Sequence, residues 1–262
     1  MSWQITAFYQ FHPLEASEVE SLTHSLRTLS EETSLCGLIL IGPEGINGTV
    51  AAQPDDMQKL KSLLGEFEPF HEMMFKDSQS EKRPFRRFTV RIREQILTLP
   101  SREDLPQGEN GHLSPEQWHE MLSTEEDILL LDIRNWYETE LGAFRGAIDP
   151  KVSNFSELVE WCQTLEVPKD QKVLMYCTGG IRCEKASLAM QSQGFSQVYQ
   201  LEGGILNYLA HYPEGEFEGE CFVFDHRVAV TSDLNPSERY ALCPHCGNPA
   251  EQWLECRHCQ KE

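Results

Sequence analysis

The sequence predicts an α/β protein with two domains and a short cysteine-rich tail. Three observations support this prediction. Short apolar runs alternate with segments whose apolar residues recur at helical spacing, up to about residue 212. Residues 98–113 hold two prolines and two glycines without any apolar period, which is typical of a linker. Four of the nine cysteines follow residue 242.

The sequence of the first domain, residues 1–97, predicts a structure of two layers, a sheet and its helices. Residues 3–11 alternate as a strand does, and the apolar residues of 14–29 recur at helical spacing. Two apolar runs, 37–41 and 49–52, flank the turn-rich stretch GPEGING. A second helical pattern follows Pro54, and a last strand is expected near 87–97. The order βαββαβ indicates a ferredoxin-like α/β sandwich.

The sequence of the second domain, residues 114–212, predicts a parallel sheet that is covered by helices on both faces. Ser114 and Pro115 have the pattern of a helix start. Short apolar strands alternate with helices after it, which is the pattern of parallel sheets. The strands are expected at 128–134, 172–177 and 198–201, and the helices at 155–165 and 182–194. Residues 213–262 are polar and end in the cysteine cluster.

Composition narrows the class of protein. The chain has 22 basic and 42 acidic residues and a formal charge of −20, which opposes loose binding to polyanions, so a nucleic-acid site must be local. There is no export signal and no apolar run long enough for a membrane span, which predicts a soluble, cytoplasmic protein that needs no membrane. Nine cysteines in such a protein favour metal binding or thiol chemistry over disulfides.

Cys177 stands where a predicted strand passes into a predicted helix, in VLMYCTGGIRCEKAS (173–187). Ligands of open parallel sheets bind at such points. Glycine-rich backbone and a helix N-terminus hold anions, so we expect an accessible thiol of low pKa, with Arg182 adding a fixed positive charge. The alternative is a buried structural cysteine. The expected anion-binding loop is Thr178, Gly179, Gly180 and Ile181.

The spacing within this loop separates two chemistries. Thiolate phosphatases place five residues between cysteine and arginine, whereas four separate Cys177 from Arg182. The shorter loop fits a single sulfur better than a phosphate. Cys183 is open to two interpretations, a second, resolving thiol or a helix residue that packs inward.

The loop CTGGIR resembles the active loop of rhodanese, or sulfurtransferase, domains. The upstream LDIRNWYETELGAFRGAI resembles their structural element, through Asp132, Arg134 and Glu138, and VYQLEGGILNY resembles their last strand and helix. Together with GPEGINGT and FVFDHR, the string YCTGGIRCEKAS resembles one narrower family, the rhodanese-domain tRNA uridine hydroxylases, over nearly the whole chain.

That resemblance implies oxygen-dependent 5-hydroxylation of the wobble uridine of tRNA. It implies that Cys177 is the active residue, through a persulfide, with molecular oxygen as co-substrate. Hydroxylation rests on the resemblance alone, because the sequence has no G-x-G-x-x-G motif and no evident facial triad for iron. The residues identify no electron or sulfur donor.

A basic segment closes the first domain. Residues 82–93, KRPFRRFTVRIR, hold six of the 22 basic residues and no acid. Alternation places Phe88, Val90 and Ile92 on one face of a strand and Thr89 with the arginines on the other. Such a row can contact a phosphate backbone. The alternative is an edge strand protected by charge. The candidate RNA-binding residues are Arg86, Arg87, Arg91 and Arg93.

The C-terminal cysteines form two C-x2-C pairs that are separated by nine residues. Two such pairs can supply four thiolates to a tetrahedral zinc ion. His245 and His258 lie inside the pairs and are expected not to be ligands. The alternative is a reduced cysteine-rich tail. The candidate ligands are Cys243, Cys246, Cys256 and Cys259.

Three functions therefore remain open. The first is a tRNA uridine hydroxylase whose first domain docks tRNA. The second is a sulfurtransferase that passes sulfane sulfur from Cys177 to a small acceptor or to a partner protein. The third is a non-enzymatic binding scaffold.

Overall fold

The computed structural model describes residues 2–98, 111–124 and 127–261, which fall into two compact units divided near residue 107. Most of the predicted linker, residues 99–110, lies outside the described residues. The last two residues of the predicted linker form a strand of the second unit.

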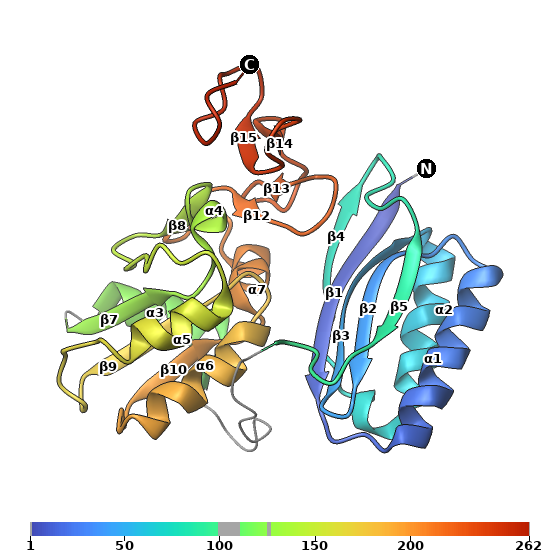
Figure 1. Cartoon of the computed structure of the whole chain (residues 1–262), viewed down its shortest axis with the longest axis horizontal. Helices are drawn as coiled ribbons and strands as arrows, with labels where there is room; N and C mark the ends of the chain where they lie inside the picture. The colour runs from blue at the N-terminus through green and yellow to red at the C-terminus, as the bar shows by residue number, and fades with distance from the viewer. Residues whose placement is uncertain (1, 99–110, 125–126, 262) are drawn as a thin grey trace. The chain divides into compact units, whose positions relative to one another are not determined.

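The first unit is a five-stranded sheet in the order β4-β1-β3-β2-β5. Helices α1 and α2 cover one face of it (Figure 1). The first four strands in this order are antiparallel neighbours and follow the ferredoxin-like plan. The elements are β1 (Trp3–Phe11), α1 (Ala16–Glu31), β2 (Cys36–Gly42), β3 (Gly45–Ala52), α2 (Pro54–Gly65), the 3₁₀ helix η1 (Glu68–Phe70), β4 (Lys76–Ser80) and β5 (Phe88–Ile92).

The assignment of the fourth strand from sequence is wrong. The strand expected near 87–97 is the fifth, β5, and it pairs in parallel with β2 at one edge of the sheet. The fourth strand is β4, which pairs with β1 at the other edge. Its sequence KDSQS contains no apolar residue, so no periodicity marks it. Main-chain pairing with β1 forms this strand.

The predicted reversal GPEGING is also shorter than expected. Strand β3 begins at Gly45, so that only Pro43 and Glu44 separate it from β2. Gly45 has φ 134°, and a Cβ there would lie 2.0 Å from the carbonyl oxygen of Gln10. Only glycine fits at this position.

The second unit has a parallel sheet in the order β6-β10-β9-β7. As predicted, helices cover both of its faces (Figure 1). The elements are β6 (His112–Leu113), α3 (Pro115–Thr124), β7 (Ile128–Asp132), α4 (Trp136–Thr139), β8 (Gly142–Phe144), α5 (Phe155–Cys162), β9 (Lys172–Tyr176), α6 (Ile181–Ser192), β10 (Val198–Leu201) and α7 (Gly204–His211).

Alternation along β7 and β9 divides the core of this unit into two layers. Leu130, Leu174 and Tyr176 face α3 and α7, where Trp118 and Tyr208 are buried. Leu131, Val173 and Met175 face the opposite layer, which contains α5 and α6. Strands that are buried on both faces are apolar throughout, which explains the continuous runs in the sequence.

The C-terminal extension is folded onto the second unit. Strand β11 (Phe217–Gly219) pairs with β8, and β12 (Cys221–Phe222) pairs with β13 (Ala229–Val230). The last hairpin is β14 (Tyr240–Leu242) with β15 (Pro249–Glu251). His258 reaches helix α4, where its ring lies 4.6 Å from that of Trp136.

Within the three described ranges, no helix combines the length and the apolar character that crossing a membrane requires.

Candidate active site

The Cys177 loop joins the end of β9 to the start of α6. Gly180 caps α6 with φ 97°, a conformation that glycine adopts readily. Its N–H donates a hydrogen bond to the Cys177 sulfur at 3.1 Å. The sulfur is therefore held at a helix N-terminus, as the strand-loop-helix pattern predicts.

Electrostatics favour the thiolate form of Cys177. Burial alone would raise its pKa, but a hydrogen bond with Cys183, the charge of Arg182 and the N–H groups of Arg182 and Gly179 outweigh burial. Together they lower the pKa of Cys177 to about 5. A thiolate is the nucleophilic form of cysteine, so this sulfur is suited to attack on an electrophile at neutral pH.

The expectation of an accessible thiol does not hold. Cys177 is 0% exposed, because it packs in the layer that contains Met175, Cys183 and Ala186. The neighbouring loop residues Gly179 and Ile181 are half-buried. Local pattern does not show this burial, part of which comes from the start of α7, a distant segment that packs against the loop.

Arg182 is paired with a buried carboxylate. Its guanidinium donates to both oxygens of Glu138, at 2.6 and 2.8 Å. The Thr178 hydroxyl donates to Glu138 at 3.0 Å, so its side chain belongs to this ion pair. Glu138 is fully buried, and burial would raise its pKa, but the charge of Arg182 lowers it. The charges of Arg182 and Glu138 therefore cancel each other, so the thiolate supplies the net negative charge of this group.

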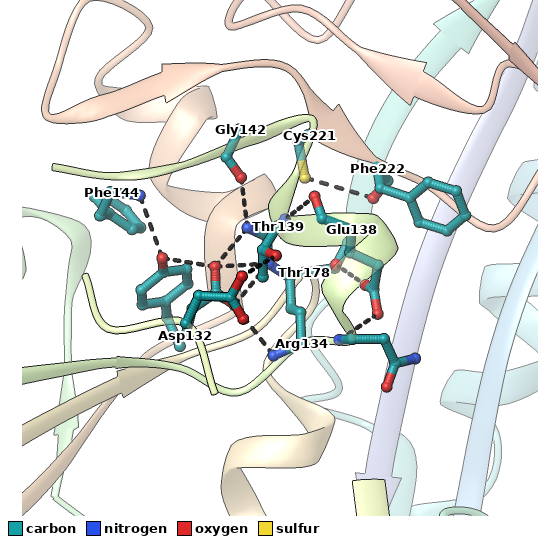
Figure 2. A network of polar contacts seen from close by, with 12 residues as sticks. Asp132, Arg134, Glu138, Thr139, Gly142, Phe144, Thr178, Cys221 and Phe222 are labelled. Carbon is teal, nitrogen blue, oxygen red and sulfur yellow. Dashed lines mark hydrogen bonds and ion pairs between the residues drawn. The ribbon is translucent and has the colours of Figure 1, made fainter. Parts of the chain in front are cut away.

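Asp132 and Arg134 form a second buried ion pair, in the same polar network as Glu138 (Figure 2). Arg134 lies 2.6 Å from Asp132 and donates to the carbonyl oxygen of Gly142 at 2.6 Å. The Tyr176 hydroxyl donates to Asp132 at 2.7 Å and accepts from the N–H of Phe144 at 3.2 Å. This network joins the ends of β7 and β9 to α4, which carries Glu138. Tyr176 was not singled out from the sequence.

Cys183 faces the same interior as Cys177. It is 0% exposed, and burial raises its pKa well above the usual value, with its hydrogen bond to Cys177 adding to the rise. Cys183 is thus a neutral thiol, whose sulfur lies 3.9 Å from the carbonyl oxygen of Met175 and which also interacts with the Cys177 sulfur. This geometry agrees with inward packing and also places a second thiol beside the first.

The start of α7 packs against the main chain of the Cys177 loop. The N–H groups of Ile205 and Leu206 donate to the carbonyl oxygens of Cys177 and Thr178, at 3.0 and 3.1 Å. Gly204 allows this approach, because a Cβ there would lie 2.4 Å from the Cys177 oxygen. The Gly-Gly pair before ILNY is the sequence signal for this contact.

Residues 222–230 form a tight turn beside Arg182 that sequence reasoning did not assign to the site. Asp225 and Arg227 repeat the pairing of Asp132 and Arg134, with a 2.6 Å contact between buried side chains. The ring of Phe224 lies 5.9 Å from the Arg182 guanidinium. The string FVFDHR had contributed only to the family resemblance.

The four C-terminal cysteines form a cluster, and their sulfur atoms lie within 4.8 Å of one another. Cys243 and Cys259 are 3.7 Å apart, as are Cys246 and Cys256. Zn–S bonds of about 2.3 Å in a tetrahedron place sulfurs about 3.8 Å apart, so the cluster fits a zinc ion. Four protein ligands leave no open position, which is the pattern of a structural site.

The candidate RNA-binding arginines, Arg86, Arg87, Arg91 and Arg93, are all exposed. Strand β5 places Val90 against the helices, and Arg91 points to the opposite face of the sheet by alternation. Ile92, expected on the buried face, is 50% exposed at the end of the strand. Both interpretations of this segment remain, since β5 is an edge strand and the exposed arginines lie on it and next to its ends.

Comparisons with known proteins agree with these features. Family models match residues 3–96 as a UPF0176 acylphosphatase like domain, 114–211 as a rhodanese-like domain and 218–262 as a rhodanase C-terminal region. A protein of Bdellovibrio bacteriovorus named tRNA uridine(34) hydroxylase is 43% identical over 94% of this chain and 71% of its own length. The chain belongs to the tRNA uridine(34) hydroxylase family.

A second member of the family, from Legionella pneumophila strain Paris, is 42% identical over 88% of this chain and 91% of its own length. Among solved structures, the Alr3790 protein from Anabaena sp. covers 41% of this chain and 91% of its own length, with a TM-score of 0.36 and 23% identity. Family membership rests on the sequence relatives, whose matches span both units.

Proposed function

We propose that this protein hydroxylates carbon 5 of the wobble uridine of tRNA and that Cys177 is its catalytic residue. Family membership supports the reaction, because relatives at 43% and 42% identity are named tRNA uridine(34) hydroxylase. One geometric observation supports the residue: a cysteine whose pKa is lowered to about 5 lies at a helix N-terminus beside Arg182.

The overall reaction in this proposal replaces the C5–H bond of uracil by a C5–OH bond. Molecular oxygen is the oxidant. One of its atoms enters the base and the other leaves as water, so the balance requires two electrons and two protons from a reductant.

Cys177 acts in this proposal as a persulfide. Its thiolate attacks the outer sulfur of a donor R–S–SH, forms the anion Cys177–S–S⁻, and releases the thiol R–SH. The short loop supports this step, since its amides and the helix N-terminus stabilise an anion. Arg182 is expected to hold the sulfur anion through its charge while its hydrogen bonds remain with Glu138.

A sulfurtransferase is the second candidate. The match of residues 114–211 to rhodanese-like domains and the four-residue spacing from Cys177 to Arg182 favour it. In this reaction the outer sulfur of the same persulfide passes to a nucleophilic acceptor, and the Cys177 thiolate is regenerated.

Nucleosides from the tRNA of cells that lack the protein separate these candidates. Loss of an oxygen-bearing uridine supports hydroxylation, and loss of a thiolated uridine supports sulfur transfer. Cys177→Ser should not restore the product, because a hydroxyl neither ionises at neutral pH nor carries sulfur. If Cys177→Ala restores it fully, the protein is a scaffold and neither proposal holds. Labelled dioxygen, followed by mass spectrometry of the nucleoside, tests the source of the oxygen.

The first unit is the tRNA-docking domain in this proposal, and Arg86, Arg87, Arg91 and Arg93 are its phosphate contacts. Arg91 lies on the edge strand β5 and the other three lie next to its ends, and the exposure of all four supports this role. They stand in an otherwise acidic chain, so tRNA would meet a local basic row.

The four-cysteine cluster is proposed to hold structural zinc through Cys243, Cys246, Cys256 and Cys259. Bound zinc would cross-link the two C-x2-C pairs, the second of which follows the last hairpin. Elemental analysis of the purified protein tests this proposal. A reduced cluster without metal is the alternative outcome.

A further inference from the structure

We propose that Phe224 is the platform on which the uracil ring of the substrate stacks beside the Cys177 loop. This inference rests on the proposed function, since it concerns how the target base is held.

Exposure distinguishes Phe224 from the aromatic residues around it. Its side chain is 56% exposed, whereas Phe222 and Tyr176 are buried. Its neighbours in the chain, Val223 and Asp225, are also buried. One side of the ring packs edge-on against Phe222, and the exposed remainder can contact a flat ligand.

The turn holds this ring in place. The N–H of Val223 donates to the carbonyl oxygen of Val228 at 2.9 Å, and the Val228 N–H donates to Asp225 at 3.0 Å. Val228 has φ 64°, a conformation that is costly for a β-branched residue. The Asp225–Arg227 ion pair fixes the turn from inside. A backbone held against its preference is typical of functional sites.

Aromatic contacts fix the direction of the ring. Phe222 lies edge-on to Phe224 at 5.0 Å and to Tyr137 at 5.4 Å. Tyr137 is in helix α4, the helix that carries Glu138. The platform is therefore anchored to the same element as the active-site ion pair, and a rigid ring binds a base with little loss of entropy.

Arg182 connects Phe224 to the reactive sulfur. Its guanidinium lies 5.9 Å from the Phe224 ring, and its positive charge helps to lower the pKa of Cys177. The charges of Arg182 and Arg227 are already met by Glu138 and Asp225. An uncharged, flat ligand suits this surface better than a phosphate. Unpaired bases of RNA loops are bound in this way, by stacking on aromatic side chains.

The test compares variants at Phe224 under steady-state tRNA hydroxylation. Phe224→Ala and Phe224→Leu should raise KM by about 5- to 150-fold, the range for loss of one base–aromatic stack. Phe224→Tyr should stay near the wild-type value, because it keeps the ring. Trp253→Ala is the matched control, since Trp253 is also an exposed aromatic of this unit, at 95%. An equal effect at Trp253, or a normal KM in Phe224→Leu, overturns the proposal.

A second readout separates stacking from a covering role over Arg182. If Phe224 only shielded Arg182, Phe224→Ala would change the ionisation of Cys177, which the ultraviolet absorbance of the thiolate reports. We expect that titration to be unchanged in Phe224→Ala, and a shift would overturn the stacking role.

Photo-crosslinking makes the test independent of the reaction. A tRNA with 4-thiouridine at the wobble position should crosslink to the peptide that contains Phe224. If crosslinking succeeds but no hydroxyuridine forms, the proposed function fails and the platform stands. If hydroxyuridine forms but the crosslink maps elsewhere, the platform is wrong and the function stands.

Discussion

At the scale of single residues, the proposed chemistry of the site depends on Cys177 being ionised while it is buried. A buried charge is unfavourable unless neighbours compensate it. Here a thiol, a guanidinium and two backbone N–H groups do so, and they lower the pKa to about 5. The compensation comes from several groups, so removal of one should shift the ionisation without abolishing it.

The first prediction concerns the pH dependence of this ionisation. The part of the ultraviolet thiolate absorbance that disappears in Cys177→Ser reports the ionisation of Cys177. In the wild type this part should rise as the pH increases through about 5, because the protonated thiol dominates only below the pKa. Arg182→Gln should move the midpoint upward, since a nearby positive charge favours the thiolate. Arg145→Gln, an exposed arginine of the same unit, is the control and should leave it in place. A wild-type midpoint at or above the ~8.5 of a free cysteine contradicts the thiolate assignment.

The second prediction separates the two roles of Cys183. As the donor to the Cys177 thiolate, it lowers the pKa of Cys177. Cys183→Ala should therefore raise the midpoint, and Cys183→Ser, which keeps a donor, should restore much of it. Activity should fall less in Cys183→Ser than in Cys177→Ser. Equal and total losses in both serine variants would instead show that the two thiols work as a redox pair.

At the scale of elements, strand β5 combines a structural and a proposed binding role. Its main chain pairs with β2, and Arg93 donates its N–H to Ile41 at 2.8 Å. Its outward side chains do not contribute to that ladder. Substitution of the arginines should therefore leave the fold intact, which makes the RNA contact testable by itself.

The third prediction is that replacement of Arg87, Arg91 and Arg93 by Gln weakens tRNA binding. The dependence of log K on log salt should flatten by roughly 0.7–0.9 per lost phosphate contact. The titration of Cys177 should not change, because these residues lie in the other unit. Lys59→Gln on α2 is the control, since that helix covers the opposite face of the sheet. An unchanged salt slope would mean that the row only protects the sheet edge.

At the scale of the whole molecule, the cysteine cluster ties the end of the chain to the second unit. The knuckles repeat one geometry: Gly247 donates to the carbonyl oxygen of Cys243, and Gln260 donates to that of Cys256. His258 lies 3.4 Å from Glu140, the residue that caps the C-terminus of helix α4. Metal at the cluster would therefore stabilise a segment that contacts the helix carrying Glu138.

The fourth prediction follows from this arrangement. The purified protein should contain one zinc per chain, and Cys246→Ser should contain far less. Chelation should lower the melting temperature of the wild type by more than about 4 °C, since 1 kcal/mol corresponds to about 2–4 °C for domains near this size. It should not change that of Cys246→Ser. His245→Ala should keep the metal, because only the four thiolates are expected to bind it. Absence of zinc with an unchanged melting temperature would contradict a structural metal.

The sequence by itself determined the parts of this protein that depend on short-range pattern. Apolar periodicity predicted the alternating strands and helices of the second unit, and the spacing CTGGIR placed Cys177 at a helix start. The cysteine spacing predicted the four-sulfur cluster. Each of these signals lies within a few residues, where local sterics and ligand geometry limit the outcome.

Only the tertiary structure decided the features that depend on contacts between distant segments. Strand β4 carries no apolar residue and forms because β1 lies beside it. Cys177 is buried rather than accessible in part because the start of α7, at Gly204 and Ile205, packs against its loop. Phe224 reaches Arg182 through a turn more than 40 residues further along the chain. Such contacts are set by the packing of the whole unit, which no local pattern of residues encodes.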